Sequence, residues 1–366
     1  MSLFSRLNPL SNNSFAHKIT DRYQQAVGIP NLPVLHIRPF RDTPGIDAGT
    51  TLFRDLYRDP KHGTPPTYSF SLLYEERSVR VLMSSPEPER IRGHVSGTYP
   101  NSTVNDVDPA DAFPTMHDGE YVAGIRFDLE EDCCFPLRHQ GSKVDPLSGD
   151  PYTSLLPKVA ATDGERVIVQ LTFEPVGDSW FRRGKVGSTS DEVADAMQDG
   201  RLVGEINPHV VESKRDRHIA TDIQNQRGRP AFHASLRVLA VGPTAEAAET
   251  RAQSIGEFFT TTFSHPGGQS LVPTPLTSSE AIQNAIEAIS TRDLWLHGQQ
   301  PGRARSWLTG TQSVLTDQEL AVLVHIPTQN DVHAPDLDWN RMQSGPGAPA
   351  DSTQHATETE EQDGAW

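Results

Sequence analysis

Cysteine is nearly absent from the 366-residue chain, and this absence excludes several kinds of site. The two cysteines are neighbours, Cys133 and Cys134, so they cannot close an ordinary structural disulfide, and they lack the C-x-x-C spacing of a zinc or redox site. We expect both thiols to be buried as apolar groups. Without a cysteine framework or a recognisable secretory signal, the sequence indicates a cytoplasmic protein.

Lysine is also scarce. Only six of the 32 basic residues are lysine, and the net charge is −16. An excess of strongly hydrated carboxylates with few lysines is typical of proteins that stay dissolved in concentrated salt, so we expect a halophilic, archaeal source. An acidic protein from a mesophile would share the charge but would not require so little lysine. The negative charge disfavours non-specific DNA binding at low salt, whereas molar salt screens such a field within about 3 Å.

Long apolar runs are missing as well. No run approaches the length of a membrane-spanning helix, so the sequence predicts no such helix. An N-terminal arm over residues 1–34 carries spaced apolar residues among polar ones. Because it has few basic residues to attract anionic lipid, we expect this arm to pack on the protein rather than on a membrane.

Motifs for catalysis or nucleotide binding are absent. The chain has no G-x-x-x-x-G-K-[ST] phosphate loop, and the segment 184–189 contains a Gly-Lys pair without the required spacing. No serine lies in a G-x-S-x-G elbow. His325 has no partner at the spacing of a metal site, and we expect it to pack structurally. The sequence therefore predicts no catalytic centre, no cofactor, no metal ion and no small-molecule substrate.

Alternating apolar residues predict strands in the first half of the chain. The pattern predicts a β-hairpin over 68–83 and then a helix that ends at Tyr99-Pro100. With the strand that follows, the order β-β-α-β is that of a ferredoxin-like unit. We expect a first α+β domain over residues 35–178, completed by strands over 102–107, 121–129 and 167–173 and a helix over 151–161.

A second α+β domain is predicted over residues 231–327, after a polar linker with a short helix over 179–230. Its strand over 232–240 leads into a long helix capped by Thr244, and another strand and helix follow. This block echoes the first one. The predicted fold is thus α+β, with two or more ferredoxin-like β-α-β units whose antiparallel sheets are covered by helices. A disordered acidic tail is predicted over residues 328–366.

The last predicted helix begins at a capping box, in which Thr316 and Glu319 bond to each other's backbone amides. The segment T-x-x-E-L-A-x-L-x-H-x-P over 316–327 resembles the segment just ahead of the motor domain in conjugation-type DNA-transfer ATPases of the HerA–FtsK group. The resemblance covers roughly residues 35–340. Its other elements occur in the family's order: Arg38-Pro39, Tyr99-Pro100-Asn101 and the Phe232 strand with its helix.

The resemblance implies an accessory region that docks or assembles a P-loop motor at a translocation channel, as in type IV secretion-like conjugation. Because the phosphate loop, the Walker-type acid and the arginine finger are missing, it implies no ATPase activity. The implied partner is a separately encoded HerA/FtsK-type ATPase; alternatively, the chain is a truncated relative of one. The protein would act in the cytoplasm, at the inner face of a membrane translocation complex. The expected partner-docking residues are Thr316, Glu319, Leu320, Leu323, His325 and Pro327.

Two other classes of function stay open. One is a single-stranded DNA-binding protein that uses a basic and aromatic strip, formed by Trp180, Arg182, Arg183, Lys185 and Arg215. This hypothesis requires these side chains to share one exposed sheet face. The other is an uncharacterised enzyme, which requires a pocket with convergent titratable groups.

Overall fold

The structure is a computed structural model, and most of the chain between residues 14 and 340 can be described in it. The described residues are 14–30, 32–40, 45–160, 164–177, 180–181, 189–203, 209–211, 213–294, 313–327 and 336–340. They form a mixed α and β structure with antiparallel strands, as the sequence predicts. None of the described helices is long and apolar enough to cross a membrane.

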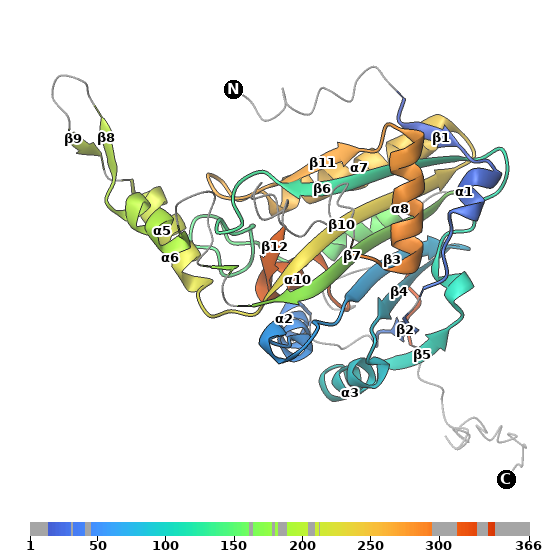
Figure 1. The fold of residues 1–366 in the computed structure, drawn as a ribbon, viewed down its shortest axis with the longest axis horizontal. Coiled ribbons are helices and arrows are strands. Elements are labelled where there is room, and N and C mark those ends of the chain that lie inside the picture. Colours follow the sequence, from blue (N-terminus) through green and yellow to red (C-terminus); the bar gives the residue numbers. More distant parts are fainter. Residues whose placement is uncertain are drawn as a thin grey trace, which may run out of the picture.

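Ten strands form one antiparallel sheet whose order differs from the order of the chain (Figure 1). Eight of them lie side by side in the order β1 (Ala16–Lys18), β6 (Tyr121–Leu129), β10 (Ala231–Gly242), β7 (Arg166–Val176), β3 (Tyr68–Glu75), β4 (Ser78–Ser84), β2 (Val34–Arg38) and β5 (Thr103–Val107). The other two strands lie off this order. β11 (Leu271–Pro275) pairs with residues 125–129 of β6, beyond the part of β6 that pairs with β1, and β12 (Val314–Thr316) pairs with the start of β10.

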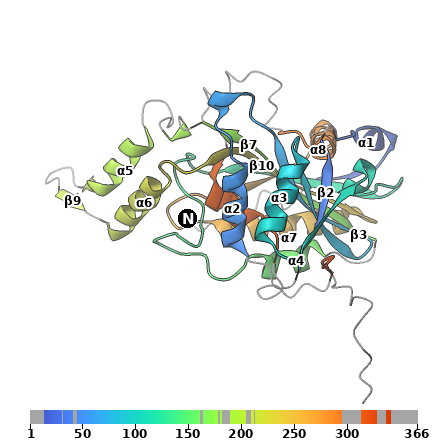
Figure 2. The same cartoon turned by 90° about the horizontal axis from the view of Figure 1, so that it is seen from below.

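Helices cover both faces of this sheet. The larger apolar core lies on one face, where five helices pack against it: α2 (Ile46–Leu56), α3 (Pro88–Thr98), α4 (Tyr152–Val159), α7 (Ala245–Phe263) and α10 (Asp317–Leu323). A smaller apolar core lies on the opposite face beneath α8 (Ser279–Thr291) and α1 (Asp21–Gln25). Seen from below, α8 and α1 lie across the sheet from α4 and α7 (Figure 2). Two short 3-10 helices, Pro60–His62 and Pro109–Ala112, lie in connections.

The two predicted domains are not separate in the structure. β10, from the predicted second domain, lies between β6 and β7 of the predicted first domain and pairs with β7 from Ala231 to Val241. The reason is that β10 buries side chains on both faces, with Val238 in the larger core and Leu239 in the smaller one. Such a strand has to be central in a sheet. Separate ferredoxin-like units are therefore not confirmed, although the predicted hairpin, helices and strands are present.

Part of the predicted linker over 179–230 forms an arm that projects from the sheet (Figure 1). It consists of α5 (Ser190–Gln198), the paired strands β8 (Arg201–Val203) and β9 (His209–Val211), and α6 (Lys214–Asn225). The base of the arm packs on the body through Ile219 and Ile223 of α6, in a third apolar cluster that also contains Cys134. Cys134 is buried as predicted and Cys133 is partly buried. The two cysteines are present as thiols, and burial raises the pKa of Cys133 to about 12.

Both ends of the described chain are attached to the sheet. In the described part of the predicted N-terminal arm, β1 pairs with β6, and Phe15 and Tyr23 are buried, so this part of the arm packs on the protein as predicted. Residues 1–13 of the predicted arm lie outside the described residues. Residues 336–340 belong to the predicted disordered tail, yet Leu337 is buried and bridges to Val79 of β4, so this part of the prediction is wrong. The tail prediction for 328–335 and 341–366 lies outside the described residues.

Candidate functional site

The start of α10 is held by the predicted capping box, and the structure confirms it. The Thr316 hydroxyl accepts the Glu319 amide, and Glu319 Oε2 accepts the Thr316 amide at 2.7 Å. Its other oxygen, Oε1, accepts the backbone amide of Leu137 at 2.8 Å. Glu319 therefore joins α10 to the loop that follows β6.

Glu319 is a buried acid, with only 2% of its surface exposed. Burial raises the pKa of its carboxyl to about 7, although hydrogen bonds from Thr316 and Leu137 favour the charged form. Acidic residues with a shifted pKa are common at functional sites, but they also occur in structural ion-pair and hydrogen-bond networks. Here every contact of the carboxylate described above serves to fix the backbone, which favours a structural role.

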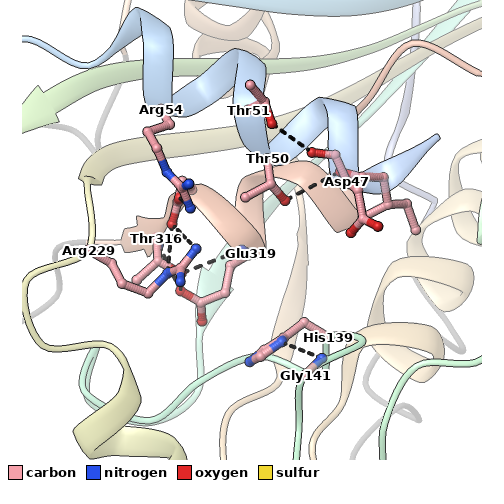
Figure 3. Close-up of polar contacts among 11 residues, drawn as sticks. Asp47, Thr50, Thr51, Arg54, His139, Gly141, Arg229, Thr316 and Glu319 are labelled. Carbon is pink, nitrogen blue, oxygen red and sulfur yellow. Dashed lines mark hydrogen bonds and ion pairs between the residues drawn. The ribbon is translucent and has the colours of Figure 1, made fainter. Parts of the chain in front are cut away.

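Asp317, the next residue of this site, is completely buried and pairs with two arginines. Figure 3 shows these two arginines, Arg54 and Arg229, reaching toward one another beside Thr316. Arg229 Nε donates to Asp317 Oδ1 at 2.8 Å, and Arg229 Nη2 lies 2.7 Å from the same oxygen as an ion pair. Arg54 of α2 reaches Asp317 Oδ2 with Nη2 at 3.2 Å. The Arg229 side chain is 20% exposed and that of Arg54 is 55% exposed, so the pair with Arg229 is the more protected from solvent.

His325, at the other end of α10, is packed as a structural residue, as predicted. Its ring stacks on Tyr152 with centroids 4.2 Å apart. One ring nitrogen lies 3.0 Å from the Ala321 carbonyl oxygen and the other lies 3.0 Å from Asp150 Oδ2. The Tyr152 hydroxyl accepts the His325 amide. Because both ring nitrogens have protein partners, His325 has little capacity left for a ligand.

A second buried polar group lies between α6 and two loops. Asp222 of α6 accepts the Lys143 amide at 2.9 Å and lies 3.7 Å from Nε2 of His265. In the described part of the chain, neither nitrogen of the His265 ring has a hydrogen-bond partner. His139 lies nearby, and burial lowers its pKa to about 4, so its ring is neutral at pH 7. Within the described residues no group of three His, Cys, Asp or Glu side chains can hold a metal ion.

The structure places the predicted docking residues in the core rather than on the surface. Thr316, Glu319, Leu320, Leu323, His325 and Pro327 are all buried. Buried side chains cannot form a docking surface, so the prediction that these residues contact a partner is wrong. The sequence did carry a signal that this helix is buried. The run 320–324 is apolar on every side of the helix, which indicates a helix surrounded by protein.

The predicted DNA-binding strip is also not formed by the residues that can be placed. Trp180 is 6% exposed and packs edge-on against Phe181, so its faces are not open for base stacking. Arg215 lies on α6 and donates to the Pro266 carbonyl, not on a sheet face. Arg182, Arg183 and Lys185 lie outside the described residues.

Sequence reasoning missed the residues that complete this site. Asp317, Arg54 and Arg229 carry no motif, and their contacts span 263 and 88 positions of the chain. Only a charged residue beside an apolar helix could have indicated a buried ion pair. The same holds for His139 and His265, which come from loops.

The comparison with protein families covers almost the whole described chain. The family model described as "Domain of unknown function (DUF8128)" matches residues 12–340. The chain belongs to this family. The DUF8128 match spans every strand and helix given above, including the segment 336–340 beside β4. This supports treating the single large sheet and its attached ends as one unit. No curated protein matches the chain.

Proposed function

We propose that this DUF8128 protein is a non-catalytic docking module for a separately encoded P-loop ATPase of the HerA/FtsK type that transfers or pumps DNA. The observation that carries the proposal is spatial. Two of the segments that carry the resemblance to the accessory regions of such ATPases, Arg38-Pro39 and Tyr99-Pro100-Asn101, are distant in the sequence but both contact the segment 336–340. A shared packing unit is a stronger basis for the resemblance than the separate short motifs are.

These contacts join β2, the turn after α3 and the segment 336–340. Arg38 Nε donates to Asp338 Oδ2 at 2.9 Å. The Asn340 amide donates to the Pro39 carbonyl at 2.9 Å, and its side-chain nitrogen donates to the Asn101 carbonyl at 2.6 Å. Asn101 has a positive φ of 64°, which suits the turn after Tyr99-Pro100. The Arg38-Pro39 and Tyr99-Pro100-Asn101 motifs thus hold the segment that follows the last junction.

The arm is the element that we propose for contact with the motor. The helix α10 is buried, whereas α5, α6 and the β8–β9 hairpin extend away from the sheet (Figure 1). The first turn of α6 presents the exposed side chains of Lys214, Arg215 and Arg217, on a protein whose net charge is −16. A basic patch on an acidic protein fits an acidic surface of the ATPase. Such a complex would act in the cytoplasm, at the inner face of a membrane translocation complex.

The test is a pull-down of the tagged full-length protein from its own high-salt lysate, with the bound proteins identified by mass spectrometry. We expect a HerA/FtsK-type ATPase, and we expect Lys214→Glu with Arg217→Glu to abolish its recovery. Lys61→Glu, which changes an exposed lysine outside the arm, is the matched control. Recovery of DNA without an ATPase would favour the DNA-binding alternative, and an ATPase retained by the arm variant would exclude the arm as its contact.

A further inference from the structure

The face of the sheet beneath α8 has a polar half that the docking role does not use. Two neighbouring rows of side chains cross it, in register from strand to strand. One row contains Arg126 on β6, Arg237 on β10, Gln170 on β7 and Ser71 on β3. The other contains Ser235, Thr172, Ser69 and Ser84. Seven of these eight side chains are buried, and Arg126 is the exception.

Arg237 is the central group of these rows, and its side chain is only partly satisfied. The residue is 1% exposed. Its Nη2 donates to the Thr172 hydroxyl at 3.0 Å and to the Asp293 carbonyl. Its Nε and Nη1 have no hydrogen-bond partner among the residues that the structure describes. Burial lowers the pKa of Arg237 to about 9, so the group still carries its charge at pH 7. A buried guanidinium with unused N–H groups is costly unless something accepts them.

Two further arginines lie around Arg237. Arg126 stands directly opposite it in the register, and like charges in such a pair repel. Arg126 has Asp128 at 3.8 Å. Arg292, at the end of α8, is also buried and donates to the carbonyls of Ile289 and Ala112 rather than to a carboxylate. Asp293, which is exposed, favours the charged form of Arg237, and Arg292 opposes it.

The hydroxyl and amide groups around Arg237 suit an oxygen-rich ligand. Gln170 already donates to the Ile289 carbonyl at 3.0 Å, and Ser71 lies 3.4 Å from the same nitrogen. Serine and threonine hydroxyls rotate, so they can donate to an anion that enters beside them. The Arg126 side chain is 30% exposed, so the row is open to solvent at its β6 end.

We propose that this polar half-face binds a small oxyanion, a phosphate or a carboxylate group, through Nε and Nη1 of Arg237, with Arg126 at the solvent side. A charge-assisted hydrogen bond of this kind is stronger than a neutral one, and arginine is the residue most suited to such groups. Because Arg237 is buried, the ligand is a free anion or a small molecule rather than the backbone of duplex DNA. The proposal is independent of the docking role and would survive its failure.

The experiment measures binding of inorganic phosphate and of acetate to the full-length protein, by calorimetry and by thermal unfolding at constant ionic strength set with KCl. We expect phosphate to raise Tm, because a ligand that binds only the folded state stabilises it. Arg237→Gln should weaken binding by roughly tenfold or more. Arg251→Gln, which removes an arginine paired with Glu165 outside these rows, should leave binding unchanged.

The outcomes separate the two sources of the anion. Binding of phosphate alone assigns a phosphate group, and binding of both anions assigns an oxyanion site open to carboxylates as well. If Arg237→Gln does not fold, Arg126→Gln tests the proposal instead. The Arg126 side chain lies at the solvent end of the row, and its removal should still weaken anion binding. An unchanged Tm with no calorimetric signal for either anion, or equal binding by wild type and Arg126→Gln, would overturn the proposal.

Discussion

Arg229 and Asp317 form an ion pair with two contacts. Two of the three guanidinium nitrogens, Nε and Nη2, lie 2.8 and 2.7 Å from the same carboxylate oxygen, Oδ1. The pair joins two parts of the chain that are 88 residues apart. Arg229 follows the C-terminal end of α6, and Asp317 is the first residue of α10. The contact therefore attaches the base of the arm to the helix that the sequence singled out for docking.

Removal of this pair should destabilise the protein far more than removal of its exposed neighbour. Arg229→Ala leaves the buried Asp317 carboxylate with only the exposed Arg54, so we expect a loss of about 3 kcal/mol or more in the free energy of unfolding. Arg54→Ala, the matched control, removes a half-exposed partner and should cost about 1 kcal/mol or less. Denaturant unfolding of the three proteins measures both values. Equal losses would show that the two arginines share the charge of Asp317 equally.

Glu319 should make the stability of the protein depend on pH. Its pKa is about 7 in the folded protein and 4.5 in an ordinary environment, so the folded state keeps the proton longer than the unfolded one. Between these values the free energy of unfolding contributed by Glu319 falls as pH rises, by roughly 3 kcal/mol at most. Buried His36 and His139, each with a pKa lowered to about 4, act in the opposite direction and lose stability as pH falls from 6.5 to 4.

The measurement is therefore a difference between variants. The free energy of unfolding of wild type and of Glu319→Gln is measured from pH 4.5 to 8. The histidine contributions are the same in both proteins, so they cancel in the difference. The stability of wild type should fall relative to the variant as pH approaches 7. Glu89→Gln, on an exposed side chain of α3, should run parallel to wild type. A constant difference between wild type and Glu319→Gln across this range would show that the hydrogen bonds to Glu319 outweigh its burial.

The sequence predicted the elements of the fold well because their signals are local. The alternating residues of β3 and β4, the long stripe of α7 and the capping box at Thr316 each depend on neighbours in the chain. The order of the strands in the sheet does not depend on neighbours in the chain. The position of β10 depends on what packs on both of its faces, and the uninterrupted apolar run 238–241 was the signal for a central strand.

The candidate site was harder to predict for the same reason. His325 and the capping box were predicted with their structural roles, because helix ends have sequence rules. The partners of Asp317 and Glu319 were not, since Arg54, Arg229 and Leu137 come from three other parts of the chain. Periodicity describes one element at a time and does not show which elements meet.

The segment 336–340 should be bound to the sheet less firmly than the core strands are. Val79 donates to the Asp336 carbonyl at 2.7 Å and accepts the Asp338 amide at 3.0 Å, and Leu337 is buried beside them. Leu337→Ala should release this segment locally, because it removes the segment's buried apolar side chain. Hydrogen exchange should then accelerate at the Val79 amide but not in β7. Asp336→Ala changes an exposed side chain and should leave exchange at Val79 unchanged, whereas global acceleration in Leu337→Ala would show that the segment is part of the core.

Gly49 on α2 should not tolerate alanine, although alanine is normally the better helix residue. A Cβ at position 49 would lie 2.9 Å from the His325 Cβ and 3.4 Å from the Ala321 Cβ, so α2 and α10 would have to separate. We expect Gly49→Ala to cost about 1–3 kcal/mol, as overpacking does. Gly93→Ala on α3 is the matched control, because nothing lies within 4 Å of its Cβ and the substitution should stabilise by about 0.5–1 kcal/mol. Thermal unfolding of both variants decides the point: opposite signs place the cost in the α2–α10 contact, and a gain in both would show that α10 can move away from α2 without loss.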